Sequence, residues 1–141
     1  MDKWETSRYC SSRALVRSSV KLVQVATCTT ILGIGFKEED GGYLHTESLK
    51  GAKTFALWPL SQAAESCFGE DSWPHELPAP QAWLEFDVDD VAKATEELES
   101  QGHRMLVRNK KEPWGQTVSR FITPEGLLVG ITLTPSMREE K

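Results

Sequence analysis

The stretch that decides the fold lies at 84–107, LEFDVDDVAKATEELESQGHRMLV. Apolar and polar residues alternate over 81–88, which is the pattern of a half-buried strand. Asp89 or Asp90 then offers an N-cap to a helix, and Gly102 predicts where that helix ends. The stretch therefore predicts a strand, a helix and the start of a second strand.

The residues that follow complete one structural module. A polar loop is expected at Asn109–Gly115 and a tight turn at Pro124–Gly126. These two breaks separate three segments with the composition of strands, at 103–108, 116–123 and 127–134. The order predicted for the second half is strand, helix, strand, strand, strand.

The first half gives the same order less clearly. Val20–Leu32 is rich in β-branched residues, which locally favour a strand. We expect a helix there, because the corresponding element of the second half is a helix. Strands are expected at 13–17, 34–39, 43–48 and 53–58, with a further short helix at 60–68.

These element orders predict one α+β domain built from two βαβββ modules. The chain of 141 residues fits a single domain by length. A connector containing three prolines cannot form regular structure and separates the halves. The expected division of the domain 1–141 is module one at about 11–68, the connector at 69–80 and module two at about 81–135.

Composition and charge exclude several classes of partner. The chain carries 16 Lys and Arg against 21 Asp and Glu, a formal net charge of −5. This balance argues against binding to nucleic acid or to an anionic membrane surface, which both favour a basic face. No apolar stretch is long enough to span a membrane, and no apolar signal-peptide core is seen. The three cysteines are far apart, which is typical of reduced thiols. We therefore expect a cytoplasmic protein.

The stretch at 84–107 and a second one, EPWGQTVSRFITPEGLLVGI at 112–131, closely resemble the second module of the vicinal oxygen chelate superfamily. That superfamily includes glyoxalase I, bleomycin- and fosfomycin-resistance proteins and extradiol dioxygenases. In the first half, ILGIGFKEEDGGYLHTE at 31–47 is similar to the family, whereas 27–30 lacks its usual aromatic pair. The resemblance implies a curved mixed sheet around a pocket and a homodimer.

The resemblance also bears on metal binding. In metal-using members, His, Glu or Gln at four strand positions hold a divalent ion that polarises substrate oxygens. These positions fall on Trp83 and Gly130 in the second module, and near Ser11 and Ala56 in the first. A shift of one residue would bring in Cys10. No position carries a convincing ligand, so the resemblance implies a metal-free protein without a cofactor or an assigned catalytic residue.

A cupped sheet would line its pocket with one face of each strand. Tryptophan faces stack on flat ligands, and the carboxylates of Glu85 and Asp87 would attract a cation. His45 is alternatively a general base, a metal ligand or a rim residue, and Trp83 alternatively fills space or forms a dimer contact. The candidate ligand-binding residues are Trp83, Trp114, Glu85, Trp58, His45 and Arg17.

Three classes of function follow from these expectations. The first is metal-independent binding of a small aromatic or cationic organic molecule, similar to bleomycin-resistance-type proteins and implying antibiotic resistance. The alternative is a metal-dependent lyase similar to glyoxalase I, or a dioxygenase. It requires ligands that the mapped positions do not supply, and it would make His45 and Glu47 important for metal affinity. A catalytically silent module that binds a protein partner is a third class.

Overall fold

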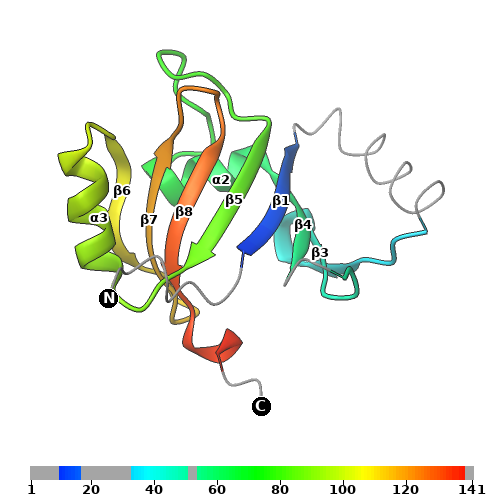
Figure 1. The fold of residues 1–141 in the computed structure, drawn as a ribbon. Helices are drawn as coiled ribbons and strands as arrows, with labels where there is room; N and C mark the ends of the chain where they lie inside the picture. Colours follow the sequence, from blue (N-terminus) through cyan, green and yellow to red (C-terminus); the bar gives the residue numbers. More distant parts are fainter. Residues whose placement is uncertain (1–9, 17–32, 51–53, 139–141) are drawn as a thin grey trace.

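The computed structural model describes residues 10–16, 33–50 and 54–138, with only the backbone described for 10–16. These residues build one eight-stranded sheet with the order β2-β3-β4-β1-β5-β8-β7-β6 (Figure 1). None of the helices in these ranges is long and apolar enough to cross a membrane. The elements are β1 (Cys10–Val16), β2 (Lys37–Glu39), η2 (Asp40–Gly42), β3 (Tyr43–Thr46), β4 (Phe55–Pro59), α2 (Leu60–Phe68), β5 (Ala82–Asp87), α3 (Val91–Ser100), β6 (Met105–Lys111), β7 (Thr117–Ile122), β8 (Leu128–Leu133) and η3 (Pro135–Met137).

The two halves of the sheet repeat each other about its centre. There β1 pairs with β5 antiparallel, while β1 is parallel to β4 and β5 is parallel to β8. Each half then continues outward through antiparallel pairs, β4-β3-β2 on one side and β8-β7-β6 on the other. The expected α+β fold is confirmed. The helix expected at Val20–Leu32 lies outside the described residues, and the module boundaries stay a prediction.

The second module forms as its sequence pattern predicts. In β5, Trp83 and Glu85 are buried on one face of the sheet, and Phe86 packs toward α3 on the other. The side chain of Asp90 caps α3 by accepting a hydrogen bond from the Lys93 backbone N–H at 2.9 Å. The apolar face of α3 closes a core against β7 and β8, formed by Val88, Val91, Ala94, Leu98, Phe121, Val129 and Ile131.

The helix α2 covers the face of the sheet opposite to α3. Its Ala63 packs with Leu128, whereas α3 packs against the neighbouring Val129, and successive strand residues point to opposite faces. Beneath α2, the rings of Trp58 and Trp83 lie 4.4 Å apart between centroids, at 40°. The two halves of the chain therefore share an aromatic core on the α2 face.

Several element boundaries differ from the predicted ones by two or three residues; β2, for example, begins at Lys37 instead of at 34. The expected loop at Asn109–Gly115 begins later, because β6 continues to Lys111. The pairing of β6 with β7 is interrupted by register shifts, and Asn109 has a φ of 50°. Bulges of this kind are common at sheet edges. Because of these bulges, the polar residues at the end of β6 continue the edge strand without alternating apolar and polar residues, which is the pattern that predicts a strand from sequence.

Candidate functional site

A cavity of about 790 Å³ opens between the two halves on the α2 face of the sheet. Side chains from β3, β4 and α2 line it from the first half, and side chains from β5, β6 and β7 line it from the second. Five of the six expected ligand-binding residues line this cavity: His45, Trp58, Trp83, Glu85 and Trp114. The sixth, Arg17, lies outside the described residues.

The tryptophans have different roles in the cavity wall. Trp83 is 1% exposed and Trp58 is 8% exposed, so both belong to the core as well as to the wall. Trp114 lies in the loop between β6 and β7 and is 63% exposed. Its indole N–H donates to Gln116 Oε1 at 3.1 Å. Trp114 is therefore the aromatic face that a ligand can cover without disturbing the core.

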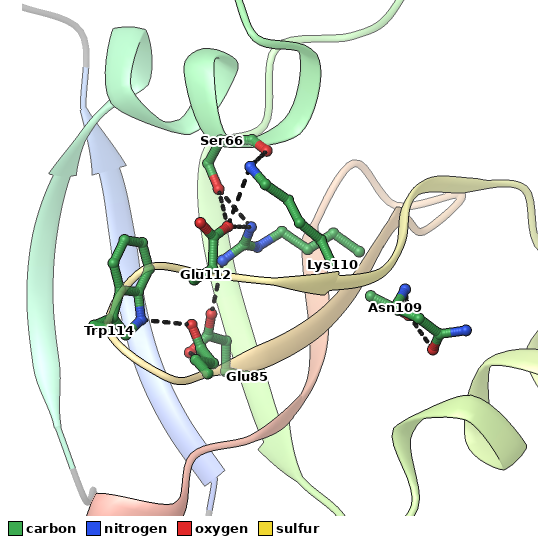
Figure 2. A network of polar contacts seen from close by, with 9 residues as sticks. Ser66, Glu85, Asn109, Lys110, Glu112 and Trp114 are labelled. Atoms are coloured by element: carbon green, nitrogen blue, oxygen red, sulfur yellow. Dashed lines mark hydrogen bonds and ion pairs between the residues drawn. The ribbon is translucent and has the colours of Figure 1, made fainter.

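A network of buried charges forms the inner part of the site (Figure 2). Arg120 on β7 is 1% exposed, and its Nη2 lies 3.4 Å from Glu85 Oε1. Its Nη1 donates to Ser66 Oγ at 2.7 Å and lies 3.7 Å from Glu112 Oε1. The guanidinium also lies over the ring of Trp58, with its Cζ 5.3 Å from the ring centroid. Arg120 thus joins two carboxylates and the aromatic core.

Ser66 connects α2 to this network. Its hydroxyl donates to Glu112 Oε1 at 3.0 Å, and its backbone carbonyl accepts from Lys110 Nζ at 2.9 Å (Figure 2). Glu112 also lies 3.4 Å from Lys110 Nζ. These contacts hold α2, from the first half of the chain, across the cavity onto β6 and β7 of the second half. Burial raises the pKa of the neighbouring Cys67 thiol, which Arg120 opposes in part, so the thiol stays protonated at neutral pH.

Gly130 makes room for the buried ion pair. It is the cross-strand partner of both Glu85 and Arg120. A Cβ at Gly130 would lie 3.0 Å from Glu85 Cγ and 3.4 Å from Glu85 Oε1. The side chain of Glu85 therefore passes over Gly130 to reach Arg120, and any side chain at position 130 would press against it.

Substitution of Gly130 by alanine is expected to lower the free energy of unfolding by about 1–3 kcal/mol, because the new methyl group displaces Glu85. Urea denaturation measures the change. Gly35→Ala is the matched control, since a Cβ there meets no atom within 4 Å and the backbone has no positive φ. A Gly130→Ala variant as stable as the control would show that Glu85 does not depend on this gap.

The residues at the metal positions implied by the resemblance do not fit a divalent ion. The side chains of Trp83 and Ala56 have no atom that binds a divalent metal ion. Gly130 has no side chain, and the side chain of Glu85 passes over it. The Ser11 side chain is not among those described. Within the described ranges, no three His, Cys, Asp or Glu side chains are grouped so that they could hold a metal ion.

The outer part of the cavity is acidic. Among the described residues, six carboxylates and two basic side chains line the cavity, and both basic side chains, Lys110 and Arg120, contact carboxylates. His45 lies at the rim, stacked on Tyr43 at 5.7 Å, with Nε2 3.2 Å from Glu39 Oε1. The exposed carboxylates of the outer part are Glu39, Asp40, Glu47 and Glu65, and the buried ones of the inner part are Glu85 and Glu112.

Two differences from the expected site concern charge. Asp87 was expected to face the pocket, but its carboxylate is fully buried and binds Arg138. Glu85 does line the cavity, yet it is already paired with Arg120. Neither Arg120 nor Ser66 was predicted to be a site residue, because their contacts join segments that are far apart in the sequence. Their strands and helix meet only in the folded chain.

The chain belongs to the Glyoxalase/Bleomycin resistance protein/Dioxygenase superfamily, whose family model matches residues 32–131. The match confirms the resemblance to the vicinal oxygen chelate superfamily that was seen in the sequence. None of the curated proteins matches the chain.

Solved structures agree with this assignment at the level of the fold. A superfamily member from Vibrio splendidus has a TM-score of 0.61 at 15% identity, covering 88% of this chain and 97% of that one. The Mn(II)-bound glyoxalase from Novosphingobium aromaticivorans has a TM-score of 0.57 at 17% identity, covering 95% of this chain and 40% of that one. A trihydroxybiphenyl dioxygenase from Sphingomonas wittichii has a TM-score of 0.55 at 14% identity, covering 91% of this chain and 40% of that one. At these low identities, the structural similarity shows a shared fold and not a shared activity.

Proposed function

We propose that this protein binds a small aromatic cation in the cavity between its two halves, without a divalent metal. The observation that carries the proposal is the excess of carboxylates around a cavity with aromatic walls. Among the residues that the structure describes, the two basic ones lining the cavity contact Glu85 and Glu112, and four exposed carboxylates remain nearer the rim. A ligand cation is therefore attracted to the rim.

The shape of the cavity supports an organic ligand. A volume of about 790 Å³ lies within the range of about 300–1,000 Å³ that is usual for small-molecule sites. The exposed face of Trp114 offers a stacking surface, and each aromatic pair contributes about 0.5–1.5 kcal/mol beyond area burial. The site thus combines a flat apolar surface with an acidic rim, and it suits a ligand with both features.

A titration with two fluorescent probes tests this proposal. The probes are 9-aminoacridine, which is a flat cation at pH 8, and acridine, which has the same ring system but is uncharged at that pH. We expect saturable binding of 9-aminoacridine at one site, at least about tenfold tighter than acridine, a difference of about 1.4 kcal/mol. Salt should weaken the binding of the cation, because it screens the exposed rim carboxylates.

The Trp114→Ala variant is the matched test of the aromatic surface. We expect it to weaken 9-aminoacridine binding about tenfold, because one stacking face is lost. Its stability should be unchanged, since Trp114 is 63% exposed. Equal affinity for the two probes would overturn the cation preference. Saturable binding of neither probe would overturn the proposed function.

Three finer expectations belong to the same proposal. Sequestration of a cationic drug would connect this binding to antibiotic resistance. The homodimer implied by the resemblance is tested by sedimentation of the full chain. The cytoplasmic location expected from the sequence is tested by fractionation of cells that express the protein.

A further inference from the structure

The segment that follows β8 forms part of the cavity wall. Thr134, Ser136 and Met137 all line the cavity. Within the segment, the backbone N–H of Met137 donates to the Thr134 carbonyl at 3.0 Å, and that of Arg138 donates to the Pro135 carbonyl at 3.0 Å. These bonds shape a local turn, but they do not join it to the sheet.

The side chain of Arg138 joins this turn to the end of β5. Its Nε donates to Asp87 Oδ2, its Nη1 to Asp89 Oδ1 and its Nη2 to the Val88 carbonyl, each at 2.6 Å. Asp87 is fully buried, and its Oδ1 accepts the Thr134 backbone N–H at 3.1 Å. Guanidinium donors have a fixed planar geometry, so three such bonds set both the position and the direction of the segment.

We propose that Arg138 is a positioning residue for the ligand site, which it serves by holding Ser136 and Met137 in the cavity wall. This inference rests on the proposed function, because it assigns a role in binding at the same cavity. Arg138 itself does not line the cavity. Its role is to fix the wall against which a ligand that fills the cavity must fit.

The consequence is a dependence on ligand size. A ligand large enough to span the cavity needs the wall in place, whereas a small cation held at the acidic rim does not. The probes are 9-aminoacridine for the first case and benzylamine, a one-ring cation at pH 8, for the second. General loss of structure would weaken both probes alike, so the difference between them reports on the wall.

The experiment compares three variants of the full chain by titration with both probes. Arg138→Lys keeps a positive charge beside the buried Asp87 but cannot form the three-way contact. Asp87→Asn combined with Arg138→Gln removes both charges together, which avoids leaving Asp87 buried without a cation. Arg108→Gln is the matched control, because Arg108 pairs at 2.6 Å with Glu99, which also does not line the cavity.

We expect both Arg138 variants to bind 9-aminoacridine at least about tenfold more weakly than the control, with benzylamine changed less than about twofold. Adding Met137→Ala to either Arg138 variant should cause little further loss, because coupled residues are not additive. Unchanged 9-aminoacridine affinity in both Arg138 variants, or equal weakening of both probes, would overturn this inference alone. If the wild-type chain binds neither 9-aminoacridine nor benzylamine, both the proposed function and this inference are overturned.

Discussion

Replacement of Arg120 by methionine is expected to lower the free energy of unfolding by about 3–5 kcal/mol, because it removes the buried cation that lies between the carboxylates of Glu85 and Glu112. Glu85 is 2% exposed and Glu112 is 5% exposed, so water cannot take the place of the guanidinium. The variant also loses the hydrogen bond to Ser66 that helps to hold α2 over the cavity. Chemical denaturation of the variant and the wild type measures the change.

Two further variants show whether the loss comes from burial. Arg108→Met removes an arginine whose side chain is 52% exposed, and we expect it to lower stability far less than Arg120→Met, because water screens an exposed ion pair. The double variant Glu85→Gln with Arg120→Met should recover part of the loss, because it also removes one of the two buried carboxylates that Arg120 contacts. An Arg120→Met variant as stable as Arg108→Met would show that the network does not support the fold.

Replacement of Trp83 by alanine is expected to lower the free energy of unfolding by about 3–5 kcal/mol, the cost of a large cavity in the core. Trp83 is 1% exposed and packs against Trp58, Ala63 and Leu128. Its removal would also collapse one wall of the ligand cavity. Denaturation curves and 9-aminoacridine titrations of the same samples measure both effects.

Trp114→Ala separates these two roles. It should change the free energy of unfolding by no more than about 0.5 kcal/mol, as is usual for surface sites, while it still weakens the binding of 9-aminoacridine. Comparable stability losses in the two variants would contradict the placement of Trp114 at the surface. If Trp83→Ala left stability unchanged, Trp83 could not belong to the core described above.

The second module was predictable because its residues determine their own local structure. The alternation over 81–88 gives β5, and the carboxylate of Asp90 caps α3. The extent of β6 was missed, because bulges break the strand period at an edge. A β-branched segment such as Val20–Leu32 is ambiguous in principle, since local propensity and topology favour different structures there.

The candidate site was predictable only in part, and the reason lies in the distance between its residues along the chain. Strand alternation placed Trp83 and Glu85 on one face, and the cavity is on that face. The pairing of Glu85 with Arg120 could not be inferred, because the two residues are 35 positions apart. Ser66, which contacts Arg120 and Glu112, lies in the other half of the chain. Asp87 shares the alternation of Glu85, yet Arg138 binds it 51 residues later.

The central claim is that this cavity binds an aromatic cation without a metal ion. The most direct measurement is a calorimetric titration of 9-aminoacridine into protein dialysed against EDTA, with bound metal measured by mass spectrometry. We predict one saturable site in protein that holds no stoichiometric metal, with the same affinity after Ni²⁺, Zn²⁺, Mn²⁺ or Fe²⁺ is added. Binding that is absent after EDTA treatment and returns with one equivalent of a metal would contradict the claim.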